Sequence, residues 1–291
     1  MIWILFTFMA VLFQTFRNAI QSKLSSTVPT VGVTLSRFLF APPIAAIYVT
    51  ATSVSANIGV PHFSATFWCF VILAATLQIA ATSLMVILFK QKNFAVGAGL
   101  AKSEALAAGA LGLLFFGSEL SALGWLGIVI GACAVFVLSG WRRGGDLTAK
   151  TVLIGLCCGT CFALTSLFVR EASHELDTPF IQAAGWVLFW VLSLQTIVLV
   201  AFIGSRQPDT FKKLAAQPGK VLAASITSCL GSIGWFTAMA LQHVAYVKTV
   251  GQLEVLTTML ISVIWLKQPV KQHEVAGLLL IGIAALLVIW T

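Results

Sequence analysis

The sequence predicts an all-α membrane protein with ten transmembrane helices, arranged as two inverted five-helix repeats around a central cavity. Three observations support this prediction: the composition is very apolar, the apolar segments have helical length, and the two halves of the chain align. Hydrophobic residues make up 59% of the 291 residues and charged residues 9%, and the mean hydropathy is +1.01. A soluble domain has about 45–50% apolar and ~25% charged residues. The composition therefore excludes soluble enzymes, disordered chains and secreted disulfide scaffolds.

Each predicted span is a continuous apolar run, and a helix needs about 20 such residues to cross a bilayer. The strands of a membrane barrel would alternate apolar and polar residues, and no such alternation is visible. Polar, glycine- and proline-containing breaks separate the runs, and the shortest break lies at His243. The spans are residues 2–22, 30–52, 64–89, 94–116, 121–140, 149–170, 179–203, 219–242, 246–266 and 271–290. The first span lacks a signal-peptide cleavage pattern, so we expect it to be retained.

Basic residues are distributed unevenly between the two sides of the predicted bundle. The formal net charge is +8, and the connections after odd-numbered spans hold twelve Lys and Arg residues, against Arg170 alone on the other side. The twelve are Lys23, Lys90, Lys92, Arg142, Arg143, Lys150, Arg206, Lys212, Lys213, Lys220, Lys267 and Lys271. The positive-inside rule places these loops in the cytoplasm, so both termini are expected outside. The basic excess therefore indicates topology in a cell membrane, of the bacterial inner-membrane kind, rather than nucleic-acid binding.

The two halves of the chain align without a gap when the sequence is shifted by 150 residues. Glu104 then falls on Glu254, and the spans of the two halves coincide. Because each half has an odd number of spans, the second half enters the membrane in the opposite sense, as in many secondary transporters. The alternative is a chance match between apolar segments. The sequence predicts one repeat over residues 1–141, a cytoplasmic linker over 142–150 and a second repeat over 151–291.

Local patterns also carry a family resemblance. Residues 88–138 combine a polar step, a helix, the turn Gly117-Ser118-Glu119-Leu120 and a final helix with Gly127, and residues 238–289 repeat this shape with a different turn. Together with Arg37 early in the second span, these features make the chain resemble the drug/metabolite transporter superfamily, in its ten-helix EamA-type branch. The resemblance implies an EamA-like repeat in each half, a central cavity that opens alternately to each side, and export of small metabolites or drugs.

Ionisable residues inside the spans are candidates for function, because a charge at the bilayer centre costs ~2.5–3.5 kcal/mol. Glu104 and Glu254 occupy equivalent positions in the two repeats, so we expect both to face the central cavity. Buried carboxylates can exchange protons near neutral pH, which proton-coupled transport requires. In one alternative, each carboxylate is a counter-charge for a cationic substrate. In another, each pairs with a lysine or arginine and only holds two helices together.

A second pair of equivalent positions holds Lys102 and Gln252, each two residues before a glutamate. Two residues turn a helix by ~200°, so Lys102 and Glu104 are expected on opposite faces of their helix. Lys248 and Gln252 are four residues apart and are expected to share a face. The ninth span is then polar on two faces, which predicts that protein or water encloses it.

Three polar residues near span ends complete the candidate substrate-binding or coupling site. Gln14 and Arg17 form a polar patch in the first span, and Arg37 lies about two turns into the second. Arginine matches the geometry of carboxylates, so Arg17 and Arg37 are candidates for an anion clamp. The alternative is that both side chains extend to the membrane interface. Cations outnumber anions inside the spans, which favours a substrate that bears a carboxylate or is an amino-acid-like zwitterion.

The predicted function is secondary active transport of a small metabolite or drug by alternating access, with proton-coupled export as the expected form. The alternative is a channel or a lipid scramblase, which needs a continuous polar path. We expect no enzyme activity, no cofactor and no metal, because the chain has neither a catalytic motif nor a phosphate loop. The expected partners are the small-molecule substrate, protons and membrane lipids, with no nucleic acid. The chain is expected to be a monomer or a homodimer.

Overall fold

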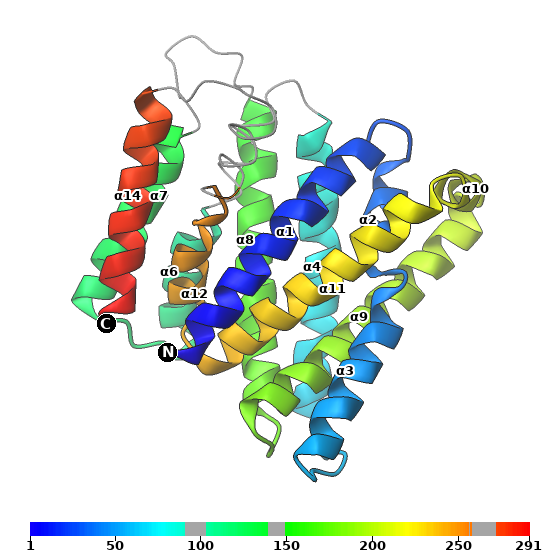
Figure 1. The fold of residues 1–291 in the computed structure, drawn as a ribbon, viewed down its shortest axis with the longest axis horizontal. Coiled ribbons are helices and arrows are strands. Elements are labelled where there is room, and N and C mark those ends of the chain that lie inside the picture. Colours follow the sequence, from blue (N-terminus) through cyan, green and yellow to red (C-terminus); the bar gives the residue numbers. More distant parts are fainter. Residues whose placement is uncertain (91–102, 139–148, 256, 258–271) are drawn as a thin grey trace.

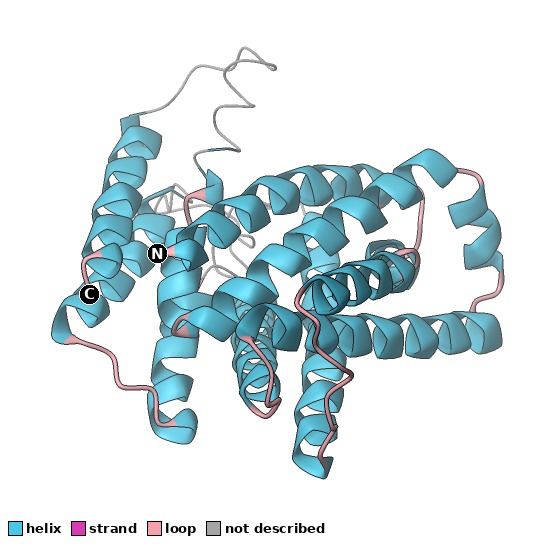
Figure 2. Ribbon diagram, turned by 60° about the horizontal axis from the view of Figure 1, so that its bottom comes forward, coloured by secondary structure: helices cyan, strands magenta, loops and turns pink. Residues whose placement is uncertain are grey.

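Helices form the regular structure in the computed structural model, which describes residues 1–90, 103–138, 149–255, 257 and 272–291. Within these ranges the helices are joined by loops and turns, and no strand occurs (Figure 2). The helices are α1 (Ile2–Leu24), α2 (Thr30–Phe38), α3 (Ala41–Ser55), α4 (Ala65–Phe89), α6 (Glu104–Phe116), α7 (Ala122–Leu138), α8 (Ala149–His174), α9 (Phe180–Arg206), α10 (Asp209–Ala215), α11 (Pro218–Leu241), α12 (Val244–Gly251) and α14 (Gln272–Ile289).

Six helical segments are long and apolar enough to cross a membrane: α1, α2 together with α3, α4, α8, α9 and α11. Three shorter apolar helices, Glu104–Phe116, Ala122–Ala134 and Ala276–Ile289, lie inside the fourth, fifth and tenth predicted spans. Helix α12 begins at Val244, just before the predicted ninth span, and the break at His243 separates it from α11. Within the predicted spans, residues 94–102, 139–140, 256, 258–266 and 271 lie outside the described residues. The chain therefore has the helices of a multi-pass membrane protein.

The second predicted span is not one continuous helix, as the sequence had suggested, because the chain breaks between α2 and α3. Pro42, at the start of α3, has no N–H to donate to the Phe38 carbonyl one turn earlier. Thr196 of α9 donates to that carbonyl instead, at 2.9 Å. A proline-induced break in a membrane helix is tolerated where neighbouring side chains satisfy the backbone in this way.

Ser225 of α11 inserts its hydroxyl group into the same break. Its Oγ accepts the N–H of Phe40 at 3.2 Å and donates to the carbonyl of Ser36 at 2.7 Å. The hydroxyl thus bridges a donor and an acceptor that would pair directly in an unbroken helix. Because Arg37 lies between these two residues, Ser225 also fixes the backbone that presents the Arg37 side chain.

Helices of the first half pack mainly against helices of the second half (Figure 1). Helix α1 packs along α11 and α4 packs along α8, while α7 lies along α14 and α3 along α9. The closest approach of α1 and α11 depends on Gly234, where a Cβ atom would lie 2.5 Å from the Phe6 carbonyl oxygen. Small residues allow such close packing of membrane helices. The interior of the bundle is therefore built jointly by both halves.

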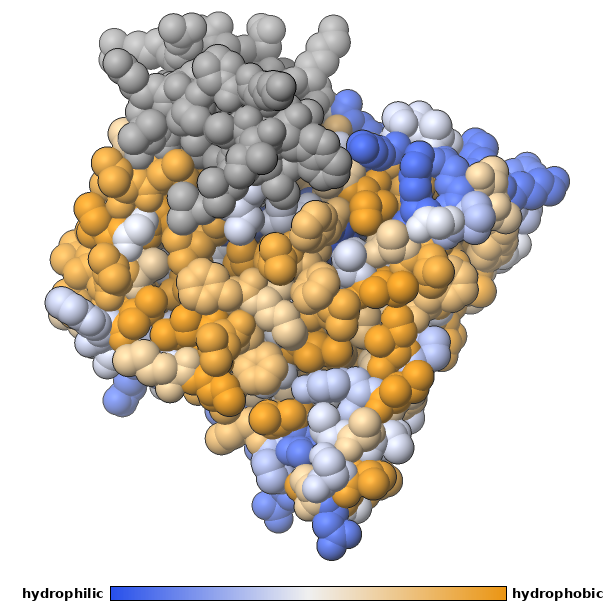
Figure 3. Space-filling view, in the orientation of Figure 1, coloured by the Kyte–Doolittle hydropathy of each residue, from blue (hydrophilic) through white to orange (hydrophobic). Residues whose placement is uncertain are grey.

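The surface has a broad apolar flank, with hydrophilic residues gathered toward the ends of the molecule (Figure 3). Large apolar side chains project outward on the flanks: Ile47 is 70% exposed, Leu114 71% and Leu279 65%. Hydrophilic residues gather around α10, at the end of the molecule opposite the two chain termini. The exposed basic residues at this end are Lys23, Lys90, Arg206, Lys212, Lys213 and Lys220. An apolar flank that lipid can cover and a basic end are typical of a membrane protein.

Arg170, the basic residue predicted on the opposite side, is used to cap a helix. Its Nη1 donates to the carbonyls of Met239 at 2.9 Å and Gln242 at 2.6 Å, at the C-terminal end of α11. The last carbonyls of a helix have no partner within it, and a cation there also interacts favourably with the helix dipole. The end of α8 therefore stabilises the point at which α11 stops and the chain turns into α12.

Candidate functional site

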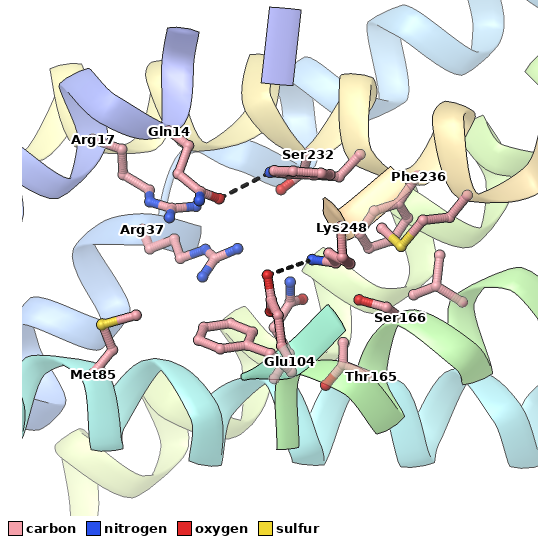
Figure 4. A pocket seen from close by; sticks show the side chains of 15 residues that line it. Gln14, Arg17, Arg37, Met85, Glu104, Thr165, Ser166, Ser232, Phe236 and Lys248 are labelled. Atoms are coloured by element: carbon pink, nitrogen blue, oxygen red, sulfur yellow. Dashed lines mark hydrogen bonds and ion pairs between the residues drawn. The ribbon is translucent and has the colours of Figure 1, made fainter. Parts of the chain in front are cut away.

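A cavity lies in the interior where helices of both halves meet, and its lining includes four charged side chains (Figure 4). Arg17 comes from α1, Arg37 from α2, Glu104 from α6 and Lys248 from α12. The cavity volume is about 40 Å³, which is room for a few water molecules. Apolar side chains, among them Met85 of α4, form the rest of the wall together with hydroxyl and amide groups. The described residues therefore form a small cavity with a charged lining.

Glu104 and Lys248 form an ion pair across the cavity, with 3.5 Å between Oε1 and Nζ. Glu104 is the first residue of α6, where the helix dipole favours an anion, and Lys248 is in the last turn of α12, where it favours a cation. The Lys248 ammonium also lies 4.3 Å from the centre of the Trp235 ring, within the range of a cation–π contact. Both residues of the ion pair are buried, Glu104 at 9% exposure and Lys248 at 7%.

Glu254 is held by side chains of α1. Its Oε2 accepts from Gln14 Nε2 at 2.7 Å, and its Oε1 accepts from Asn18 Nδ2 at 2.8 Å. The network continues on both sides, because Trp235 donates to Gln14 Oε1 at 2.9 Å and Arg17 donates to Asn18 Oδ1. The buried carboxylate of Glu254 therefore joins α1 and α11 to the segment that follows α12.

Arg37 is held in the interior by neutral hydroxyl groups. Its Nε donates to Ser228 Oγ at 3.1 Å and its Nη1 to Thr82 Oγ1 at 2.8 Å, and the residue is 3% exposed. Arg17 is 4% exposed. The interpretation in which both arginines extend to the membrane interface is therefore wrong, because these polar groups hold them inside the bundle.

Two donors beside the cavity lack an acceptor within the described part of the chain. They are Arg17 Nη1 and the hydroxyl of Ser232, and both atoms are buried. Arg37 likewise makes no ion pair with a carboxylate of the described residues. Buried donors without a partner are costly, and a guanidinium is well suited to bind an oxyanion. The arginine side of the cavity can therefore accept a carboxylate or a similar anionic group.

Gln252 is not among the side chains that line the cavity, whereas Lys248 is. Helix α12 ends at Gly251, and Gln252 is its C-cap residue, in a turn that keeps αR backbone angles. Gln252 is 1% exposed and packs beside Gly131 of α7. Lys102, its equivalent in the first half, lies outside the described residues.

The hydroxyl groups that bind Arg37 were not among the residues expected from the sequence. Thr82 and Ser232 are related by the shift of 150 residues, and so are Gln78 and Ser228. Arg37 thus bonds to one member of each pair, and Gln78 and Ser232 line the cavity. These groups could have been found from the sequence, because polar residues recur at equivalent positions of the two apolar halves.

Comparisons with known proteins agree with this architecture. Residues 149–290 match the EamA-like transporter family. A solved structure entitled "Crystal structure of protein" is similar over 98% of this chain and 95% of its own, with a TM-score of 0.68 and 17% identity, a level that indicates shared fold alone. The comparison with curated proteins gave no match. Residues 149–290 are therefore similar to an EamA-like transporter family domain, a family of the drug/metabolite transporter superfamily.

Proposed function

We propose that this protein is a secondary transporter that moves small carboxylate-bearing metabolites, including amino-acid-like zwitterions, across the cell membrane. The family match indicates a membrane transporter of the drug/metabolite type. The observation that carries the substrate class is the arginine side of the cavity, where Arg17 Nη1 has no hydrogen-bond partner and Arg37 is held by hydroxyl groups, neither arginine forming a salt bridge within the described residues. A substrate carboxylate supplies the missing acceptor.

Alternating access is supported by the way the two halves pack. Under the shift of 150 residues, α1 corresponds to α8, α4 to α11, α7 to α14 and α3 to the second part of α9. The contact between α1 and α11 is therefore equivalent to the contact between α8 and α4, and the contacts α7–α14 and α3–α9 each join two equivalent helices. This pattern is the one expected of two inverted repeats, in which one half rocks against the other around a central site. The cavity between the halves is about 40 Å³, too small for a metabolite, so loading one requires this rocking to widen it.

Glu254 is proposed as the group that couples transport to protons. As a carboxylate it accepts charge-assisted hydrogen bonds from Gln14 and Asn18 and so holds α1 in place. Such bonds are roughly twice as strong as neutral ones. Protonation of Glu254 weakens them, releases α1 and favours the opening of the cavity. Proton uptake and helix movement are thereby linked at one residue.

The test is flux into liposomes that contain the purified protein. A library of carboxylates and amino acids is screened first, and the best substrate is then measured with and without a pH gradient. We expect saturable uptake that the gradient stimulates. In Glu254→Gln we expect the stimulation to disappear while the protein remains folded in the membrane. Asp209→Asn, which changes an exposed carboxylate in α10, is the matched control and should behave as wild type.

Two results would contradict this proposal. Flux that rises linearly with substrate concentration would indicate a channel, because a carrier that binds its substrate once in each transport cycle must saturate. Full stimulation by the pH gradient in Glu254→Gln would remove Glu254 from the coupling step, although the transporter assignment itself would then stand.

A further inference from the structure

The four charged side chains around the cavity form two groups. We call Arg17 and Arg37 the arginine pole, and Glu104 with Lys248 the ion-pair pole. At one pole Arg37 is held by hydroxyl groups and Arg17 by an amide oxygen. At the other pole the cation Lys248 already contacts a carboxylate, that of Glu104. Figure 4 shows the two poles on either side of the cavity, with Arg37 opposite the ion pair. The first pole can take an added anion, whereas the second is occupied by a cation of the protein itself.

The surroundings of the Lys248 ammonium are those of a binding site for an ammonium group. The Glu104 carboxylate lies 3.5 Å away and the Trp235 ring centre 4.3 Å away. A carboxylate and an aromatic face are the two groups that most often recognise a primary ammonium. Lys248 reaches this position from α12 on a flexible four-carbon chain, so its head group can be displaced without moving the helix.

We propose that Lys248 occupies the position of the substrate's ammonium group and that a zwitterionic substrate displaces it from Glu104. This inference rests on the proposed function and names the substrate class more narrowly. The substrate's carboxylate binds at Arg37 and Arg17, and its ammonium takes the place of the Lys248 head group beside Glu104. One cation replaces another at the carboxylate, so the exchange leaves the charge at Glu104 balanced.

The apolar part of the cavity lining indicates which zwitterions fit. Met85, Phe162, Phe236 and Met239 line the cavity and offer apolar and aromatic surface to a side chain. Such a wall favours an α-amino acid with an apolar side chain over one with a polar side chain. A carboxylic acid of the same shape but without the amino group can bind only to the arginine pole, and it leaves the ion pair intact.

The experiment compares L-leucine with 4-methylpentanoate, which has the same carbon skeleton without the amino group. Their affinities are measured by equilibrium dialysis with the purified full-length protein and with Lys248→Met. Removal of Lys248 frees Glu104 for the ligand's ammonium, so leucine should bind about tenfold more tightly, the effect of one charge-assisted contact. The affinity for 4-methylpentanoate should stay the same or fall. Lys220→Met, which removes an exposed lysine from the start of α11, is the control.

Glu104→Gln tests the same inference by changing the carboxylate instead of the lysine. It removes the acceptor of the ammonium, so the preference of Lys248→Met for leucine should be absent from Glu104→Gln and from the double variant Glu104→Gln/Lys248→Met. The double variant carries no unpaired charge from this ion pair. It therefore remains informative if Lys248→Met alone does not fold.

The outcomes separate this inference from the proposed function. An equal change in both affinities on removal of Lys248 would overturn the inference and leave a purely structural ion pair. Failure of every variant to bind leucine or 4-methylpentanoate, with another carboxylate transported by the wild type, would refute the apolar amino-acid class. Failure of the wild type to transport any carboxylate would refute the proposed function itself.

Discussion

At the scale of single residues, Arg37 shows how a buried charge can be kept available for a ligand. Its partners Thr82 and Ser228 are hydroxyl groups, which orient the guanidinium without neutralising it. Glu104, in contrast, already has a cation beside it. A retained charge is costly inside a membrane, so its presence next to a cavity indicates use by a ligand.

Arg37→Gln tests this role directly. The shorter neutral side chain removes a charge-assisted contact with the substrate's carboxylate, so transport efficiency, kcat/KM, should fall about 10- to 100-fold. Uptake by reconstituted protein measures the effect, with Arg206→Gln at the exposed end of α9 as the control. If Arg37→Gln transports normally, the arginine serves only to join α2 to α4 and α11.

The sequence was sufficient to find the charged residues of the site but not their partners. Glu104, Lys248, Arg17 and Arg37 were recognisable because charges are rare in apolar spans. Their pairing depends on which helices meet, and no residue spacing contains that information. For the same reason the spacing did not indicate that Gln252 packs beside Gly131 of α7 and does not line the cavity.

At the scale of elements, the break between α2 and α3 positions Arg37 beside the cavity. The sequence located this span correctly, and its prolines are visible at 42 and 43. Pro42 causes the break, and Ser225, which is far away in the chain, stabilises it by bridging Ser36 and Phe40. The prolines are a local signal of the break, whereas the long-range Ser225 bridge cannot be read from local propensity.

Ser225→Ala is expected to destabilise the protein by about 1–3 kcal/mol, because it leaves a buried N–H and a buried carbonyl without partners. Arg37 lies between them, so substrate affinity should fall as well. Thermal unfolding in detergent and ligand binding measure the two effects. Ser205→Ala is the control, since it removes an exposed hydrogen bond within α9 that water can replace. Equal melting temperatures for the two variants would show that the break does not need the Ser225 bridge.

At the scale of the whole molecule, composition and the repeat predicted more than any local pattern did. Apolar runs predicted a multi-pass helical protein, and that prediction is confirmed for the described residues. The alignment of the halves predicted that Glu104 and Glu254 both face a central cavity. Glu104 lines the cavity, whereas Glu254 is buried against Gln14 and Asn18 of α1 and is not among the lining residues. The exact ten-helix count and the orientation in the membrane stay predictions.

Orientation is the last prediction, and the basic end of the molecule determines it. Lys212 and Lys213 lie with other exposed cations at the end opposite the termini, and the positive-inside rule places that end in the cytoplasm. Alkaline phosphatase fused to the C-terminus should therefore be active, since it folds outside, and a fluorescent protein fused there should stay dark. Replacing both lysines by glutamate weakens the charge bias and should raise the fluorescent fraction. A bright fusion to the unmodified chain would place both termini in the cytoplasm and reverse the sides to which the cavity opens.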